Sequence, residues 1–192
     1  MRGYKYKEGL LIMSKKKAKN GNKSKVRKVA LDVIIVCLLC IAGISAFNRY
    51  KIVNNYHEGS KTYSKIAELA DIPDIKGDEE FTGDINWDAL MEQNSDTVAW
   101  IYLKGTKINY PVVQASDNDY YLRRMFNGAS GIGGTIFVDA RVPGDFSGFN
   151  SIIYGHHMKD SSMFGALKSY TSYDFAKENP RFELITPKQK YH

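Results

Sequence analysis

A run of apolar residues near the N-terminus constrains this chain more than any other feature. The 19 residues from position 29 to 47 read VALDVIIVCLLCIAGISAF, with a single charge at Asp32. As a helix they would be about 28 Å long, close to the roughly 30 Å of a bilayer's hydrocarbon core. The apolar region of a cleaved signal peptide is usually shorter, about 7–15 residues. The run therefore predicts a transmembrane helix, with signal-peptide cleavage after the small residues at 43–46 as the alternative.

The charges of the chain are distributed unevenly along it. Residues 1–28 contain 11 Lys and Arg and one acidic residue, whereas residues 29–192 contain 16 basic and 20 acidic residues. The basic isoelectric point thus belongs to a tail, which argues against a body that binds nucleic acid. Basic flanks of membrane spans stay in the cytoplasm. We therefore expect a single-pass protein of the cell membrane, with a cytoplasmic N-terminus and residues 48–192 outside the cell.

Composition and spacing divide the chain into four parts. Apolar residues between 50 and 70 recur at helical spacing, interrupted at Gly59-Ser60, and the segment 71–83 is rich in acidic residues with Pro and Gly. Lys7-Glu8-Gly9 can be encoded by a ribosome-binding sequence, so Met13 is an alternative start. The expected parts are a basic tail (1–28), a transmembrane anchor (29–47), a helical stalk with a linker (48–83) and a globular part (84–192).

The globular part shows the two-residue period of β-strands. Asn86 is a suitable N-cap for a short helix at 87–93, with Trp87, Leu90 and Met91 on its buried side. Pro111 cannot donate a backbone hydrogen bond, which predicts a sheet edge or a bulge. The expected strands are 98–103, 108–114, 135–138, 151–154 and 182–186, with short helical segments at 117–126 and 164–170 and a glycine-rich loop at 128–134. This pattern is typical of a mainly β fold, a small barrel or sandwich.

The segment IIYGHHMKD, residues 152–160, contains the strongest candidate for chemistry. Histidine is the usual acid or base near neutral pH, so His156 is a candidate catalyst, although a lone histidine is more often a surface or core residue. Adjacent side chains on an extended strand point to opposite faces, so His156 and His157 should not share a metal. The glycine-rich stretch GASGIGG lacks the Lys-Ser/Thr of a phosphate-binding loop and is interpreted as a turn.

The order of several segments resembles that of sortases, the exported cysteine transpeptidases of Gram-positive bacteria, and most closely class B sortases. The segments are NSDTVAWIYLKGTKINYPVVQ (94–114), DNDYYL (117–122), GGTIFVDAR (133–141) and NSIIYGHHMKDSSMF (150–164). The resemblance implies a sortase-type β-barrel with N-terminal helices and a membrane anchor. It also implies that His156 is the catalytic histidine and that Asn118 and Leu122 lie beside the groove for the sorting-signal peptide.

The chemistry that the resemblance implies is acyl transfer in two steps. A cysteine thiolate attacks the peptide bond after Thr in the C-terminal sorting motif of a surface protein, and an amine of a cell-wall precursor or a pilin resolves the thioacyl enzyme. His156 would protonate the departing amine and then activate the incoming one. An arginine would stabilise the oxyanion, and neither a metal nor an organic cofactor is needed.

The chain departs from the sortase pattern in its nucleophile. Sortases carry the cysteine in a TLxTC-like motif on a later strand and the arginine on the strand after it. The only cysteines here, Cys37 and Cys40, lie within the apolar run, and Arg181 is not at the family's position. We therefore expect an incomplete barrel that is inactive by itself. Its unpaired strand edges should make it unstable unless a second fragment completes it.

Two other function classes stay open from the sequence. A non-catalytic, membrane-anchored extracellular binding module would share only the first half of the fold and would require a stable, soluble 48–192. An exported metalloprotein would use both histidines of the 152–160 segment and would retain a metal through dialysis.

Overall fold

The computed structural model describes residues 2–73 and 79–191, with side chains from residue 25 onward. The chain divides into two compact units, Met1–Ile52 and Val53–His192. The helix α1 (Arg2–Leu69) contributes to both units.

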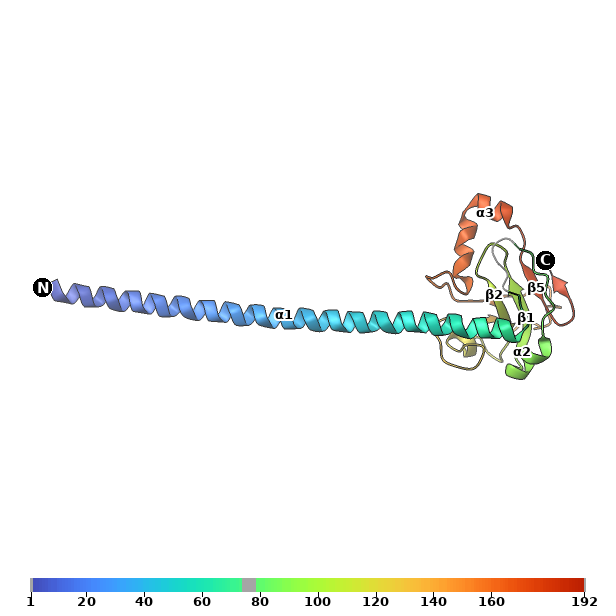
Figure 1. The fold of residues 1–192 in the computed structure, drawn as a ribbon, viewed down its shortest axis with the longest axis horizontal. Helices are drawn as coiled ribbons and strands as arrows, with labels where there is room; N and C mark the ends of the chain where they lie inside the picture. Colours follow the sequence, from blue (N-terminus) through green and yellow to red (C-terminus); the bar gives the residue numbers. More distant parts are fainter. Residues whose placement is uncertain (1, 74–78, 192) are drawn as a thin grey trace. The chain divides into compact units, whose positions relative to one another are not determined.

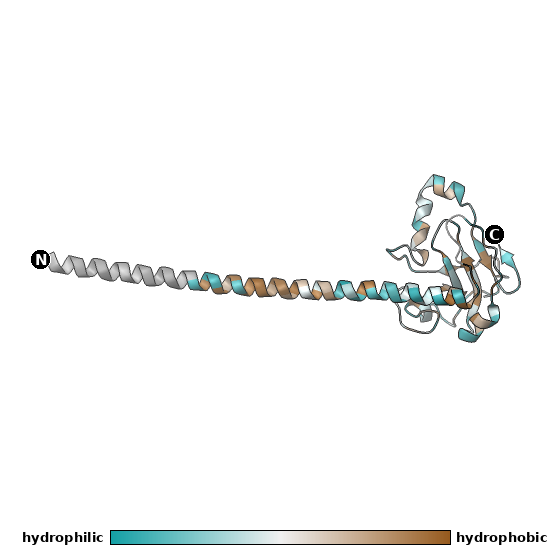
Figure 2. Cartoon of the chain, viewed as in Figure 1, coloured by the Kyte–Doolittle hydropathy of each residue, from teal (hydrophilic) through white to brown (hydrophobic). Residues whose placement is uncertain are grey.

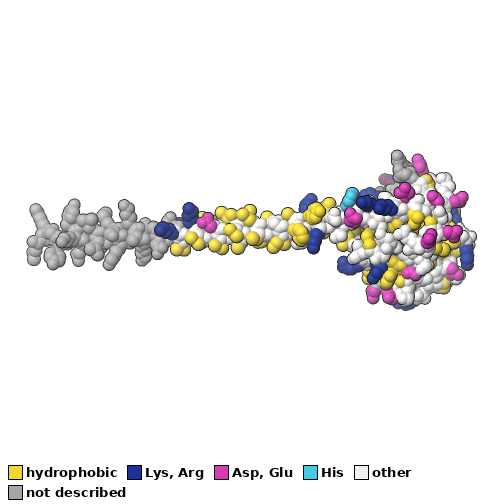
Figure 3. Space-filling view, turned by 60° about the horizontal axis from the view of Figure 1, so that its bottom comes forward, with side chains coloured by type: hydrophobic (Ala, Val, Ile, Leu, Met, Phe, Trp, Pro, Cys, Tyr) yellow, Lys and Arg dark blue, Asp and Glu magenta, His cyan; other side chains and the backbone are white. Residues whose placement is uncertain are grey.

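The part of α1 in the first unit contains the apolar run. This helix is long and apolar enough to cross a membrane. Its large apolar side chains between Val29 and Phe47 are all more than half exposed, and they form the hydrophobic band in Figures 2 and 3. Such exposure suits a lipid environment, because a helix satisfies its own backbone hydrogen bonds. The helix is thus a candidate membrane anchor.

The interruption of the apolar spacing at Gly59-Ser60 does not end the helix, because α1 continues through it to Leu69. No atom lies within 4 Å of the position that a Cβ on Gly59 would take. A single glycine costs a helix only about 1 kcal/mol, and packing of the following turns offsets this cost.

The last turns of α1 belong to the second unit and bury one face in its core. The buried residues Tyr63, Ile66 and Ala70 follow the spacing of one helix face. Asp71 then adopts a left-handed conformation, with φ of 57°. The Ile72 N–H bonds to the Ala67 carbonyl at 2.9 Å, and that of Asp71 to Glu68 at 3.1 Å. This is the Schellman pattern, so the helix ends with its last carbonyls satisfied.

The second unit is built on one six-stranded sheet with the order β4-β3-β2-β1-β5-β6. All neighbouring pairs are antiparallel except β2 and β3, which are parallel. Figure 1 shows β1, β2 and β5 side by side. The strands are β1 (Thr97–Tyr102), β2 (Asn109–Val113), β3 (Ile136–Val138), β4 (Ile153–Tyr154), β5 (Glu183–Ile185) and β6 (Lys190–Tyr191). The expectation of a mainly β fold is confirmed.

Short helices connect these strands. α2 (Trp87–Gln93) has the expected bounds, and the Asn86 side chain caps it by accepting the Ala89 N–H at 3.1 Å. Leu90 is buried as expected, whereas Met91 is exposed. The others are the 3-10 helices η1 (Tyr120–Leu122) and η2 (Phe164–Thr171) and the helix α3 (Tyr173–Glu178). α3 and β6 were not expected, because they are too short to show a period.

Pro111 lies on an inner strand, so the expectation of an edge or bulge is wrong for β2. Pro111 is opposite Trp100 of β1, while the parallel pairing with β3 begins only at Val112. The missing N–H therefore falls where no third strand needs it. The register shift lies on β1 instead, between Thr97 and Ala99.

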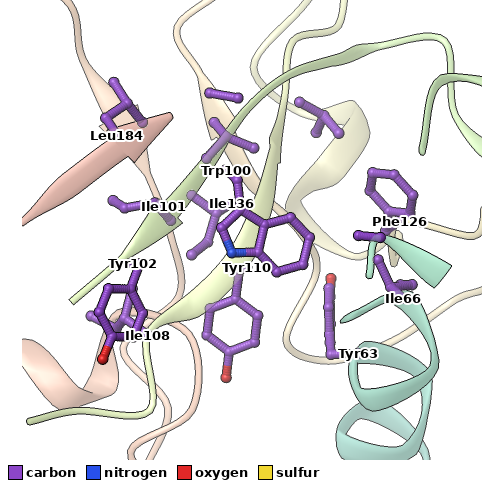
Figure 4. Packing of buried hydrophobic residues seen from close by; sticks show 14 of the residues in the cluster. Tyr63, Ile66, Trp100, Ile101, Tyr102, Ile108, Tyr110, Phe126, Ile136 and Leu184 are labelled. Atoms are coloured by element: carbon purple, nitrogen blue, oxygen red, sulfur yellow. The ribbon is translucent and has the colours of Figure 1, made fainter. Parts of the chain in front are cut away.

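The core of the second unit joins the sheet to the end of α1 (Figure 4). Trp100 is fully buried, and its indole N–H donates to the Asn109 side chain at 2.6 Å. Phe126 and Ile136 are buried beside it. This core fixes the strands from whose ends the candidate site is built.

Candidate functional site

β4 delivers His156 to the edge of the sheet. Its residues pair with β3, Phe137 opposite Tyr154 and Val138 opposite Ile153. A Cβ on Gly155 would come within 2.7 Å of the Phe164 ring. Glycine is therefore needed for the chain to pass Phe164 closely. The carbonyl of His156 then accepts the Phe164 N–H at 3.0 Å, which holds the backbone at this point.

The imidazole of His156 is held by a backbone carbonyl. Its Nε2 lies 2.6 Å from the oxygen of Leu122, and the residue is partly buried. A carbonyl oxygen only accepts hydrogen bonds, so Nε2 carries a hydrogen in this arrangement. In the neutral ring Nδ1 is then the nitrogen with the free lone pair, and it is the one available for proton transfer.

Leu122 is thus brought directly to His156, although 34 residues separate them. It ends η1, and its side chain is partly exposed. Gly134, with φ of 55°, lies so close that a Cβ there would overlap the Tyr121 and Leu122 carbonyls. Close backbone packing against Gly134 therefore supports the carbonyl that holds the imidazole.

The side-chain amide of Asn118 is hydrogen-bonded through both its nitrogen and its oxygen. It makes no described hydrogen bond to His156. Its Nδ2 donates to Asp139 Oδ2 at 3.1 Å, and its Oδ1 accepts the Ala140 N–H at 2.8 Å. It is connected to β4 through Asp139, which also accepts the Tyr154 hydroxyl. Tyr154 and His156 are two residues apart, so Asn118 is linked to the His156 strand through one shared carboxylate.

Asp139 is the residue of the site that sequence reasoning missed. It follows β3 and is only 1% exposed. Arg141 donates its backbone N–H, its Nε and its Nη2 to this carboxylate at 2.8, 2.9 and 2.6 Å. The Tyr154 hydroxyl donates at 2.9 Å. The Arg141 hydrogen bonds hold the pKa of Asp139 well below its usual range, and the carboxylate in turn raises the pKa of Tyr154. A signal existed in the sequence, an Asp directly after a strand in the segment 133–141.

His157 makes no described hydrogen bond to this cluster. It is exposed, and its backbone forms an isolated bridge with Met163. Among the described residues, no group of three or more His, Cys, Asp or Glu lies close enough together to hold a metal ion. The two cysteines, Cys37 and Cys40, belong to the first unit, whereas His156 belongs to the second.

The chain is similar in sequence to curated sortase B proteins. No family model matches it. It is 33% identical over 150 residues to a sortase B of Listeria monocytogenes, covering 75% of this chain and 60% of that protein. It is 31% identical over 164 residues to a sortase B of Staphylococcus aureus, covering 84% and 64%. The chain thus spans about three fifths of the length of these curated relatives.

Solved structures give the same result. The sortase B structure from B. anthracis in complex with AAEK1 has a TM-score of 0.64 and 34% identity, covering 72% of this chain and 66% of that chain. The Staphylococcus aureus sortase B-substrate complex has a TM-score of 0.52 and 36% identity, covering 54% and 48%. The similar sequences and the similar structures are thus all those of sortase B proteins.

Proposed function

Because the chain belongs to the class B sortases over the part of those proteins that it spans, we propose that it acts in sortase transpeptidation. The enzyme would cleave the C-terminal sorting motif of a surface protein and join the protein to an amine of the cell wall or of a pilin. The single observation that carries this proposal is the His156 imidazole, held by the Leu122 carbonyl beside the open edge of β4.

The reaction proceeds through a thioester. A cysteine thiolate attacks the carbonyl carbon of the motif's Thr, and the C–N bond to the following residue breaks as the imidazolium gives its proton to the departing amine. The incoming amine then attacks the thioester and passes a proton to the neutral imidazole, and the thiolate leaves. Support for a peptide substrate is that the similar Staphylococcus aureus structure is described as a sortase B-substrate complex.

His156 is the acid and base in this scheme. Its Nε2–H is bonded to Leu122, so Nδ1 exchanges the proton with the reacting amines. Asn118 and Leu122 would line the peptide groove. Asn118 is suited to this role because its amide is already held on two sides, and a preorganised side chain loses little entropy on binding.

The nucleophile comes from polypeptide outside these 192 residues. The cysteines present, Cys37 and Cys40, lie on the apolar part of α1. The oxyanion-binding arginine is proposed to come from the same outside segment. We expect the 192-residue chain to show no transpeptidation by itself, since no other side chain replaces a thiolate in this reaction.

The protein is proposed to be held in the cell membrane by residues 29–47. The basic tail 1–28 would remain in the cytoplasm, and the second unit would face the cell exterior. This orientation would put the peptide groove on the side where surface proteins and wall precursors are joined.

The proposal is tested on the chain fused to the part of the Listeria monocytogenes relative that follows the matched region. Cleavage of a quenched sorting-motif peptide, with and without an added amine, is the readout. His156→Ala should lower kcat by about 10²–10⁴-fold, the usual contribution of a general acid–base residue.

His157→Ala is the matched control, because it removes the neighbouring imidazole and leaves the Leu122 contact in place. It should keep most of the activity. Loss of activity in His157→Ala with normal activity in His156→Ala would contradict the assignment. Full turnover by the unfused chain would contradict the proposed source of the nucleophile.

A further inference from the structure

We propose that Tyr63, near the C-terminal end of α1, is a positioning residue for the imidazole of His156. The functional meaning of this inference rests on the proposed role of His156 as acid and base. The structural part of the inference is independent of that role, because it concerns only how a side chain on α1 sets the hydrogen bond between His156 and Leu122. Tyr63 is buried at the junction of two segments that hold His156 from different sides.

The first connection runs through the glycine-rich loop. The Tyr63 hydroxyl donates to the Gly134 carbonyl at 2.5 Å and lies 3.2 Å from Thr135 Oγ1. The Thr135 N–H in turn bonds to the Tyr121 carbonyl at 3.1 Å. Gly134 also packs directly against the carbonyl of Leu122. Tyr63 therefore holds the Gly134 backbone, against which the Leu122 carbonyl packs.

The second connection runs through the ring of Tyr110. The two tyrosine rings meet edge to face, with centroids 5.2 Å apart (Figure 4). The Tyr110 hydroxyl accepts the Met163 N–H at 3.3 Å. Met163 has a positive φ of 49°, an unfavourable conformation for a residue other than glycine. Met163 also forms the backbone bridge with His157.

The two connections converge on His156. The glycine-rich loop supports the acceptor of the imidazole, and the Met163 segment supports the backbone that carries it, since the Phe164 N–H bonds to the His156 carbonyl at 3.0 Å. A displacement of the Tyr63 side chain would move both. This arrangement would hold the ring against the Leu122 oxygen with one nitrogen protonated.

The hydroxyl of Tyr63 is suited to act as a permanent donor. Burial raises its pKa above the ordinary value of a phenol. The group therefore stays protonated throughout the physiological range. Because the hydroxyl and the Gly134 carbonyl are both buried, loss of their bond would leave a polar group without a partner. The hydrogen bond between Tyr63 and Gly134 should therefore persist in the folded protein.

The experiment uses the full chain with ¹⁵N-labelled histidine in detergent micelles at about pH 8.5, where an ordinary imidazole is neutral. Long-range ¹H–¹⁵N spectra distinguish protonated from unprotonated ring nitrogens, and His156→Gln assigns the signals. In the unmodified chain His156 should show a single tautomer with Nε2 protonated. In Tyr63→Phe both ring nitrogens should shift toward averaged values, and the Nε2–H signal should be lost to exchange.

Tyr170→Phe is the matched control. The Tyr170 hydroxyl also donates to a backbone carbonyl, that of Asn179, at 2.7 Å. Its removal should leave the His156 signals unchanged. An unchanged His156 spectrum in Tyr63→Phe would overturn the proposal, and so would an equal change in both variants, because that would show general loosening.

Tyr110→Phe decides the question if Tyr63→Phe does not fold. It removes the hydroxyl that accepts the Met163 N–H and leaves the Tyr63 contact intact. A shift of the His156 ring and His157 backbone signals would support the proposal, and unchanged signals would overturn it. None of these spectra requires a cysteine or a substrate. Failure of the fused chain to cleave peptide would therefore contradict the proposed function and leave this inference standing.

Discussion

Five hydrogen bonds stabilise the buried carboxylate of Asp139. It accepts from the Asn118 amide, the Tyr154 hydroxyl and three groups of Arg141. A carboxylate withdrawn from water is tolerated only when such partners replace its hydration. Because the three partner residues come from three separate segments, this one side chain links the groups around β4.

The stability of the second unit should depend on pH through Asp139. The folded-state pKa of Asp139 is depressed below its unfolded value of about 3.9. Its stabilising contribution is therefore present above about pH 4 and is lost as the pH falls through the folded value. Asp139→Asn should lower the urea midpoint at pH 7 and reduce the loss of stability between about pH 5 and pH 2. Fluorescence of Trp87 and Trp100, both in the second unit, reports the unfolding.

Asp119→Asn provides the comparison. Asp119 precedes η1, is exposed, and forms no cap hydrogen bond with its side chain. This substitution should leave both the midpoint and its pH dependence nearly unchanged. If Asp139→Asn and the unmodified chain lost stability in parallel on acidification, the role given to the Asp139 charge would be wrong.

At the scale of elements, the end of α1 is part of the second unit's core. Ile66 is 2% exposed and packs with residues of the sheet, whereas Leu69, three residues later, is partly exposed. The same helix contains the apolar run upstream, where side chains are exposed all round. One continuous helix thus has two kinds of surface, each suited to a different environment.

Substitutions in the last turns of α1 should separate these roles. Ile66→Ala should lower the free energy of unfolding of the second unit by about 2–5 kcal/mol, because it leaves a cavity in a packed core. Leu69→Ala on the same helix should cost less than about 1 kcal/mol. Urea unfolding followed by tryptophan fluorescence measures both. Equal effects would show that the helix end does not pack as described.

At the scale of the whole molecule, the candidate site lies next to the outermost strand of the sheet. The strand order begins with β4 and ends with β6, so among the described strands each of these two has a neighbour on one side only. Phe149 and Ile152, just before β4, are exposed. Unpaired edges and exposed apolar side chains promote association. That the 192-residue chain is unstable without a completing segment stays a prediction.

The orientation in the membrane is tested with single cysteines. In a chain with Cys37→Ser and Cys40→Ser, Ser147→Cys on an exposed loop should react with a membrane-impermeant maleimide in intact cells, and Ser24→Cys on the basic flank should react only after lysis. The reverse labelling pattern would place the second unit in the cytoplasm and would contradict an exported enzyme. Release of the protein without detergent would contradict the anchor.

Local patterns in the chain were sufficient for most of its elements, α3 and β6 excepted. The bounds of α2, the positions of β1 to β5 and the apolar run follow from periods and caps that involve residues a few positions apart. β4, the strand that precedes His156, was found in the same way. Family resemblance then identified the mainly β sortase fold, which the similar structures confirm.

The contacts around His156 could not be found in this way, because they join residues far apart in the chain. Leu122 meets His156 across 34 residues, Asp139 meets Asn118 across 21, and Tyr63 meets Gly134 across 71. Two of these three contacts involve a backbone carbonyl, for which residue type gives no signal. The strand order and the docking of α1 decided which carbonyl faces the imidazole, because packing of distant segments, and not local spacing, brings these atoms together.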